Sequence, residues 1–223
     1  MCKPSRIFLI LFITIELVVL FGEEAFTQRI LGGIYMGANL TQVDGDEYYG
    51  FHQIGLNVGP TAIIPFGKNK KWSVGFELLF SQKGSYHRGE TDTTTYRLRL
   101  NYVDIPVLVH FTDKKIISAG AGIAYGQLVG AKETEYGEQT ETNIQGPYSM
   151  IDFSVIGDVQ FRLWKRLWLG LRYQYTILPI RTRDFYNEVT KESWTREQYN
   201  NVISIRLGWI FNQEVPIKKR EKD

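Results

Sequence analysis

The segment YSMIDFSVIGDVQFRLWKRLWLGLRYQYTI, residues 148–177, decides the fold of this chain. Large apolar side chains fill most alternate positions on both sides of a short turn, Trp164-Lys165-Arg166, and polar or small residues fill the positions between them. A period of two is that of a β-strand with one apolar and one polar face. We therefore predict two long strands joined by a tight turn.

The polar face of this hairpin carries full charges, including Asp152, Asp158, Arg162 and Arg172. Strands of soluble sandwiches are usually about five or six residues long. Alternating segments of about ten residues between turn signals are instead typical of transmembrane β-barrels. The hairpin therefore indicates a barrel that crosses a membrane.

The same alternation recurs along the chain. Further strands are predicted at residues 30–40, 53–64, 72–81, 96–111, 116–129 and 202–211, which together with the hairpin makes eight. Long polar loops, at residues 41–51, 82–95, 130–146 and 180–200, alternate with short turns. Outer-membrane barrels have this asymmetry, with tight periplasmic turns and longer outside loops. The predicted fold class is all-β, an eight-stranded antiparallel up-and-down transmembrane β-barrel.

Two of the predicted strands carry a local irregularity. In residues 96–111 the apolar side chains change phase, from Leu98 and Leu100 on even positions to odd positions from Val103 onward, which predicts a β-bulge near Asn101. Residues 116–129 alternate apolar positions with a stripe of small residues, namely Ser118, Gly120, Gly122, Ala124 and Gly126. We expect this stripe to leave room for large side chains from across a narrow barrel.

The polar face is predicted to line the barrel interior, because it combines charged residues with many glycines, while aromatic residues near the strand ends of the other face suit the membrane interfaces. Eight strands enclose a space only just wide enough for side chains. An unpaired charge there would cost several kcal/mol, so the charges are expected to pair as a structural network in a filled interior. The network is predicted to comprise Glu77, Asp104, Asp152, Asp158, Arg162, Arg172 and Arg206. A soluble ligand-binding barrel with an apolar interior is the alternative.

The N-terminal residues have the order of a secretory signal, with Lys3 and Arg6 before an apolar run at residues 7–21. We expect a signal peptide in residues 1–28, a barrel in residues 29–212 and a polar tail in residues 213–223. An uncleaved anchor helix is the alternative for the first segment. Cys2, the one cysteine, falls within the signal, so the mature barrel is expected to have no disulfide and no thiol ligand.

The residue types present favour neither catalysis nor nucleic-acid binding. A net charge of +2 lacks the concentrated basic surface that nucleic-acid binding requires. His52, His87 and His110 are not spaced as metal ligands. Ser85, His87 and Asp92 share one loop but lie in no nucleophile motif. We therefore predict no catalytic, cofactor or metal site and no nucleic-acid partner.

Charged and aromatic residues between the strands define two candidate contact surfaces. The short turns carry the basic residues Lys68, Lys70, Lys71, Lys114, Lys115, Lys165 and Arg166. We interpret them as solvated turn residues, with contacts to anionic lipid headgroups as the alternative. The long loops carry the aromatic residues Tyr48, Tyr49, Tyr86, Tyr136, Phe185, Tyr186 and Trp194. Aromatic residues favour contact with a partner protein, and aromatic girdles at the strand ends are the alternative explanation for some of them.

Five segments of the predicted barrel carry recognisable motifs: GANLTQVDGD at residues 37–46, ELLFSQKGS at 77–85, YVDIPVL at 102–108, GAGIAYG at 120–126 and the strand that contains Arg172-Tyr173. Together these segments resemble the PorT-like family of outer-membrane β-barrels. The resemblance spans nearly the whole mature chain. It implies an outer-membrane barrel in a family in which some members are associated with protein secretion, and it supplies no catalytic residues. The polar tail after Phe211 departs from barrels that end on an aromatic residue.

We therefore expect an integral, non-enzymatic protein of the cell outer membrane. Its role is expected to be structural, or an interaction or assembly contact made through the loops. The expected partners are outer-membrane lipids and, through the loops, other envelope or secretion proteins. The alternatives are a barrel enzyme, acting as a lipid or peptide hydrolase or acyltransferase, and a narrow channel or secretion accessory.

Overall fold

The computed structural model describes residues 30–46, 50–67, 69–89, 95–135, 138–140, 147–186 and 191–213. The predicted signal peptide at residues 1–28 and all but the first residue of the predicted tail at residues 213–223 lie outside the described residues. The described part of the chain has no helix that is long and apolar enough to cross a membrane.

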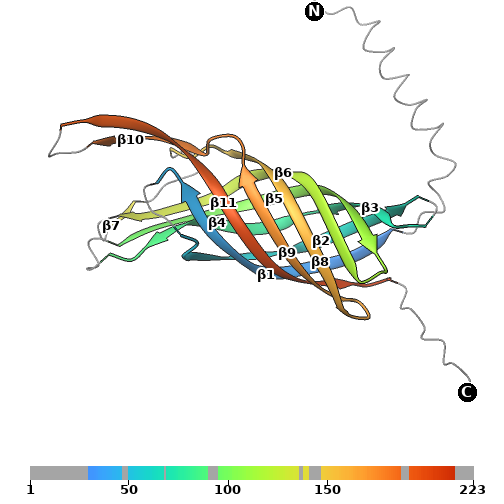
Figure 1. Cartoon of the computed structure of the whole chain (residues 1–223). Coiled ribbons are helices and arrows are strands. Elements are labelled where there is room, and N and C mark those ends of the chain that lie inside the picture. The colour runs from blue at the N-terminus through green and yellow to red at the C-terminus, as the bar shows by residue number, and fades with distance from the viewer. Residues whose placement is uncertain are drawn as a thin grey trace, which may run out of the picture.

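Eleven β-strands, all paired antiparallel, make up the described part of the chain (Figure 1). They are β1 (Leu31–Asp44), β2 (Gln53–Phe66), β3 (Trp72–Glu77), β4 (Leu79–His87), β5 (Tyr96–Asp113), β6 (Ile117–Glu135), β7 (Glu138–Thr140), β8 (Ile151–Trp164), β9 (Leu167–Thr176), β10 (Arg181–Tyr186) and β11 (Ser193–Ile210). The sheet closes on itself, because the first strand, β1, pairs with the last, β11, and the pairing of β5 with β6 completes the ring. β3 and β4 keep one register against β5 and form one wall strand, whereas β7 and β10 pair antiparallel with the end of β6 and the beginning of β11. The described wall is therefore a ring of eight strands, which confirms the predicted fold class.

The predicted hairpin is formed by β8 and β9, which turn at Lys165 and Arg166. Asp158 lies directly opposite Arg172 in the register of the two strands, and Val159 lies opposite Leu171. Directly opposite residues lie on the same face of a sheet. The charged face of one strand therefore continues into the charged face of the next.

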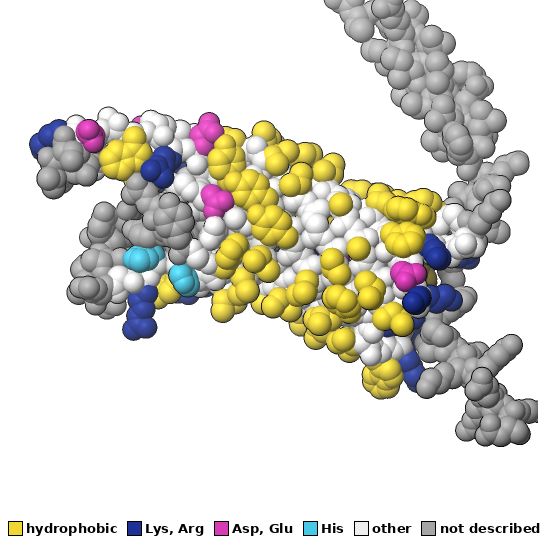
Figure 2. All heavy atoms as spheres, viewed as in Figure 1, with side chains coloured by type: hydrophobic (Ala, Val, Ile, Leu, Met, Phe, Trp, Pro, Cys, Tyr) yellow, Lys and Arg dark blue, Asp and Glu magenta, His cyan; other side chains and the backbone are white. Residues whose placement is uncertain are grey.

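The polarity of the wall is apolar outside and polar inside, as predicted from the alternation. Ile205 on the outer face is 46% exposed, whereas Asp158 and Arg172 are each only 2% exposed. Exposed apolar side chains form a band around the middle of the barrel, here called the apolar belt (Figure 2). Members of the belt include Ile34, Met36, Leu56, Phe76, Phe80, Ile105, Val109, Ile123, Tyr125, Val155, Val159, Phe161, Leu171, Tyr173, Leu207 and Trp209. Such a surface is stable in contact with acyl chains rather than with water.

The two ends of the barrel differ. The short turns at residues 67–71, 114–116 and 165–166 lie at one end, here called the short-turn end, and the longer connections lie at the other, the loop end (Figure 1). β1 begins and β11 finishes at the short-turn end, where Gly33 pairs with Ile210. Trp72 and Phe111 meet edge to face at this end, with ring centroids 5.1 Å apart. Aromatic residues at the border of an apolar belt suit a membrane interface.

The strands run further toward the loop end than the alternation predicted. β1 reaches Asp44, β4 reaches His87 and β6 reaches Glu135, while β7, β10 and the first part of β11 also lie in segments predicted as loops. Past the apolar belt the outward positions are polar, as at Arg97 and Lys132. The apolar alternation is lost there, although the backbone pairing goes on. The prediction of loops was therefore wrong for these parts of the chain.

β5 keeps one phase along its whole length, so the predicted change of phase was wrong. Its even-numbered side chains point into the barrel, and Leu98 and Leu100 are fully buried rather than outward. The bulge predicted near Asn101 is present in the β5–β6 ladder, but the additional, unpaired residue is Val129 of β6. One extra residue reverses the facing of all that follows it in a strand. As a result, Glu133 of β6 points into the barrel and is 4% exposed.

The small-residue stripe of β6 makes room for large side chains, but these come from the neighbouring strand rather than from across the barrel. A Cβ atom on Gly120 would lie 2.4 Å from the imidazole of His110, and one on Gly126 would lie 2.5 Å from the carboxylate of Asp104. Both pairs are directly opposite in the β5–β6 register. The expected source of the large groups was therefore wrong, because the nearest competitor for space is the cross-strand partner.

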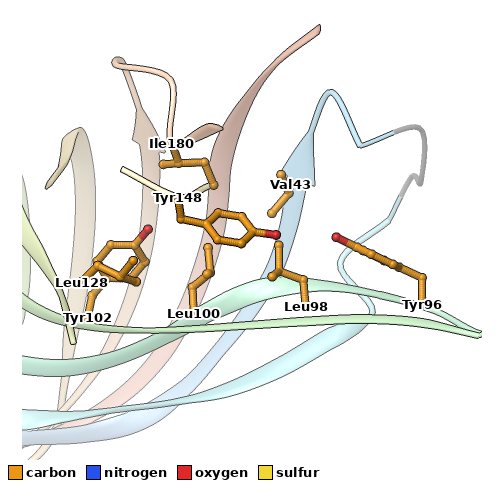
Figure 3. Close-up of a cluster of buried hydrophobic side chains, with 8 residues drawn as sticks. All are labelled: Val43, Tyr96, Leu98, Leu100, Tyr102, Leu128, Tyr148 and Ile180. Carbon is orange, nitrogen blue, oxygen red and sulfur yellow. The ribbon is translucent and has the colours of Figure 1, made fainter. Parts of the chain in front are cut away.

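An apolar cluster, here called the apolar plug, fills the barrel interior toward the loop end (Figure 3). It consists of Val43, Tyr96, Leu98, Leu100, Tyr102, Leu128, Tyr148 and Ile180. Past the belt, the outer surface of the wall is polar and the interior contains this apolar cluster, which reverses the arrangement found in the membrane. This reversal explains why the change of phase predicted in β5 was wrong, because Leu98 and Leu100 point inward although apolar residues were expected to point outward.

Candidate functional site

Four charged side chains, Glu77, Asp158, Arg172 and Arg206, meet in the interior and form what we call the lower network. Arg172 donates from Nη1 and Nη2 to the two oxygens of Glu77, both at 2.9 Å, and from Nε to Asp158 Oδ2 at 3.0 Å. Arg206 donates to Glu77 Oε2 at 2.9 Å and to Asp158 Oδ2 at 2.7 Å. Two positive and two negative charges thus compensate each other, which offsets much of the desolvation cost of burying them.

The ring of strands brings the lower network together from both sides of the barrel. Asp158, Arg172 and Arg206 lie on the consecutive wall strands β8, β9 and β11, and Glu77 lies on β3 opposite them in the ring. The ring of Tyr35 packs against Arg206, with the guanidinium carbon 4.4 Å from the ring centroid. Gly208 makes room for that ring, since a Cβ atom there would lie 2.3 Å from it.

A second charged cluster, the upper network, lies between the lower network and the apolar plug. Lys83 Nζ lies 3.0 Å from Asp104 Oδ2 and 2.9 Å from Asp152 Oδ2. Thr176 Oγ1 and Asn200 Nδ2 donate to the Asp152 carboxylate, both at 2.8 Å. One ammonium group therefore lies between two carboxylates, and neutral donors satisfy further oxygen atoms.

Lys83 was missed from the sequence because it was placed in the predicted loop at residues 82–95. Its side chain is 1% exposed and belongs to β4. The alternation itself locates it, because the odd-numbered residues Ser81, Lys83 and Ser85 continue the inward positions that begin at Glu77. A charged residue at an inward position is therefore predictable once the strand is extended past the belt.

Arg162 is the predicted network residue that the structure keeps apart from the others. Among the described residues no carboxylate lies within ion-pair distance of its guanidinium group, and its Nε and Nη1 are shielded from solvent without a hydrogen-bond partner. Its guanidinium carbon lies over the Trp168 indole, 5.0 Å from the ring centroid. Of the seven predicted residues, Glu77, Asp158, Arg172 and Arg206 meet in one cluster and Asp104 and Asp152 in another.

A third polar cluster lies outside the membrane-spanning part, at the edge of the apolar plug. Arg181 Nη1 donates to both oxygens of Glu133, at 3.1 and 3.2 Å, and to the Tyr148 hydroxyl at 2.7 Å. The Tyr96 hydroxyl donates to Glu133 Oε1 at 2.9 Å. Burial, followed by the charge of Glu133 and neighbouring tyrosines, raises the pKa of Tyr96 and Tyr148 well above the ordinary range. Both hydroxyls therefore remain neutral at physiological pH.

A cavity of about 200 Å³ lies at the short-turn end of the interior. Its lining includes Glu77 of the lower network, His110 and Arg162, together with Lys70 and Lys115 from two of the short turns. Lys70, Lys115 and Arg162 therefore bring three positive charges to the lining of a cavity that the two networks separate from the loop end.

The residues considered for catalysis or metal binding are dispersed. His52 and His87 are exposed near the loop end, Ser85 is buried, and Asp92 lies outside the described residues. His110 lies inside, with Nε2 3.5 Å from Asp158 Oδ1. Over the residues that the structure describes, no three His, Cys, Asp or Glu side chains gather in a way that would hold a metal ion.

A closed ring of long strands, an apolar belt, paired charges inside and aromatic residues at the belt borders together define an integral β-barrel of the outer-membrane class. Residues 24–180 match the family described as the outer membrane protein beta-barrel domain, and the chain belongs to this family. The protein therefore resides in the cell outer membrane, where the apolar belt contacts lipid.

Several solved outer-membrane proteins are similar to this chain at low sequence identity. Ail of Yersinia pestis is 16% identical with a TM-score of 0.49, over 81% of this chain and 98% of that one. Neisserial surface protein A is 10% identical with a TM-score of 0.47, over 82% and 96%. OprG of Pseudomonas aeruginosa is 12% identical with a TM-score of 0.39, over 82% and 95%. No curated protein sequence matches the chain significantly.

Proposed function

We propose that this protein is a closed, non-catalytic barrel that acts through contacts made at its loop end. The observation that carries the proposal is the filled interior. The lower network, the upper network and the apolar plug follow one another between the short-turn end and the loop end, and their charged members are at most 4% exposed. A barrel closed at three successive levels leaves no continuous path for a solute. The activity is therefore assigned to the outside of the barrel.

The surface best suited to a contact is the hairpin of β10 with the first residues of β11, here called the loop-end hairpin (Figure 1). Phe185 and Trp194 stack with ring centroids 6.1 Å apart, and the guanidinium carbon of Arg183 lies 5.2 Å from the Phe185 ring centroid. Tyr186 beside them is 59% exposed. Aromatic residues and arginine are enriched at protein interfaces and often dominate their energetics. We therefore propose a protein of the cell envelope as the partner.

The backbone of the loop-end hairpin supports the same proposal. Among the described residues β10 pairs with β11 and with no other strand, so its outer edge presents backbone donors and acceptors. A peptide can add to such an edge as a further strand. The proposed partner therefore docks an extended segment against β10 and packs side chains against the hairpin's aromatic residues.

The test is crosslinking in native outer membranes followed by identification of the partner. A double variant, Phe185→Ala with Tyr186→Ala, is expected to lose the crosslinked species. Tyr125→Ala, which removes an exposed ring from the apolar belt, is the matched control and should retain it. Equal recovery of the species from the two variants would refute the loop-end hairpin as the contact. Turnover of phospholipid or peptide by the purified barrel, lost in His87→Ala, would favour an enzyme instead.

We also infer that the chain is a PorT-like member of its family, and therefore a candidate secretion accessory. The segments that carry this resemblance contact one another in the interior. Asn39 Nδ2 donates to Ser81 Oγ at 3.0 Å, and Lys83 lies against Asp104 at the distance given above. Deleting the gene and comparing secreted proteins tests this inference, and an unchanged set of secreted proteins would refute it.

A further inference from the structure

We propose that the cavity at the short-turn end is a binding site for a phosphoryl group. The site is distinct from the loop-end hairpin and does not depend on the function proposed for it. Three cationic side chains line the cavity: Arg162 from β8, Lys70 from the turn between β2 and β3, and Lys115 from the turn between β5 and β6. At about 200 Å³, the cavity has room for a small anionic group.

Arg162 provides the first argument, because two of its three guanidinium nitrogens have no hydrogen-bond acceptor in the described part of the chain. Nε and Nη1 are shielded from solvent and have no acceptor in the described part of the chain. Leaving a buried donor unsatisfied is unfavourable, and more so for a charged group. An anion in the cavity would supply the missing acceptors, while the Trp168 indole holds the guanidinium plane in place.

The backbone of the two lysine turns provides an independent argument. Lys70 and Lys115 have φ values of 49° and 57°, in the left-handed region that favours glycine and asparagine. The turn at Lys114 and Lys115 closes with a hydrogen bond from Ile116 N to Asp113 O at 3.0 Å, with both central residues left-handed. Asn-Gly is the preferred sequence for such a hairpin turn. The two left-handed turns therefore hold the Lys70 and Lys115 side chains at the lining of the cavity.

The charge around the cavity also favours an anion. Glu77 is the carboxylate among the lining residues, and two arginines of the lower network already neutralise it. Figure 2 shows Lys and Arg side chains gathered at the short-turn end. A guanidinium and two ammonium groups offer more donors than the two oxygens of a carboxylate can accept. A phosphoryl group, with three or four oxygens and a higher charge, fits this donor set better.

The phosphoryl group has two candidate sources, the headgroup of a phospholipid and free inorganic phosphate. The purified full-length barrel in an uncharged detergent is titrated with inorganic phosphate and, separately, with a short-chain phosphatidic acid. Calorimetry measures binding, and tryptophan fluorescence, to which Trp168 contributes together with the other four tryptophans, gives a second signal. Binding of both probes identifies a site for any phosphoryl group, and binding of the lipid alone identifies a headgroup site.

The variants decide between a built site and general attraction to a basic surface. Arg162→Gln and Lys115→Gln are each expected to weaken binding about tenfold or more, the usual effect of losing a charge-assisted hydrogen bond. Lys165→Gln, a turn lysine outside the cavity lining, is the matched control and should bind like the parent. Lys115 is exposed, so its replacement tests the site even where Arg162→Gln fails to fold. Failure of both probes to bind the parent barrel, or equal binding by all three variants, would overturn the proposal.

Discussion

Glu77 is the residue on which the lower network depends, because it accepts hydrogen bonds from both arginines. Glu77→Ala leaves two guanidinium groups short of a counter-charge and is expected to lower the free energy of unfolding by about 3–5 kcal/mol. Glu77→Gln retains one acceptor oxygen and should lose less. Urea unfolding of the barrel in lipid vesicles, followed by tryptophan fluorescence, measures the difference.

The control for this prediction is Glu192→Ala, which removes an exposed carboxylate at the loop end. A surface substitution of this kind usually changes stability by no more than about 0.5 kcal/mol. The network would be unimportant for stability if Glu77→Ala proved no more destabilising than Glu192→Ala.

Tyr96 and Tyr148 predict how the loop end responds to alkaline pH. Burial raises the pKa of both hydroxyls in the folded protein. In the unfolded chain a tyrosine ionises near pH 10. The stabilisation is therefore complete below about pH 10 and is lost as the pH rises beyond it, because only the unfolded state then releases the proton. The free energy of unfolding should fall less steeply above this pH in Tyr96→Phe than in the parent.

Unfolding measured at a series of pH values checks the tyrosine prediction. Tyr186→Phe is the matched variant, because its side chain is exposed at the loop end. Its pH dependence is expected to follow that of the parent. A slope in Tyr96→Phe equal to that in the other two proteins would contradict the role of burial.

The bulge in β6 is the element that places Glu133. Up to the bulge the even-numbered residues of β6 face inward, and after Val129 the odd-numbered ones do. Deleting Val129 is therefore expected to turn Glu133 outward and to separate it from Arg181. The belt portion of β6 precedes the bulge, so the barrel itself should still form.

Limited proteolysis and a heat-modifiability gel separate these two expectations. The deletion variant should be cut faster at the loop end and should still migrate as a folded barrel before heating. Replacing Arg181 with Ala in the deletion variant should add little to the effect of the deletion alone, because both changes remove the same ion pair, Arg181–Glu133. Unchanged protection of the loop end in the deletion variant would argue against this role for the bulge.

The whole molecule is closed at three levels in series, so removing one level should not open it. Leu98→Ala with Leu100→Ala empties part of the apolar plug and is expected to loosen the loop end, since each buried leucine truncation typically costs about 2–5 kcal/mol. The upper and lower networks remain. Planar-bilayer recordings should therefore show no unitary conductance from either the parent or this variant. A conducting double variant would mean that the plug alone closes the barrel.

Much of the barrel wall can be predicted from the sequence alone. Successive side chains of a β-strand point to opposite faces of the sheet, so the side that each one faces is set locally, with a period of two. The hairpin of β8 and β9, the polarity of the wall, the eight-stranded ring and the presence of a bulge near Asn101 were all predictable from the alternation. The alternation stopped being informative past the membrane, where outward positions become polar. That is why Lys83 and the loop-end hairpin were placed in loops.

The contacts inside the barrel were decided only by the tertiary structure. Residue order predicted that Glu77 and Arg172 face inward, but their pairing depends on which strands stand opposite each other after the ring closes. Closure also separates Arg162 from the carboxylates and leaves a basic cavity beside it. The physical reason is range: alternation is set by adjacent residues, whereas ion pairs and cavities are set by the register and diameter of the whole ring.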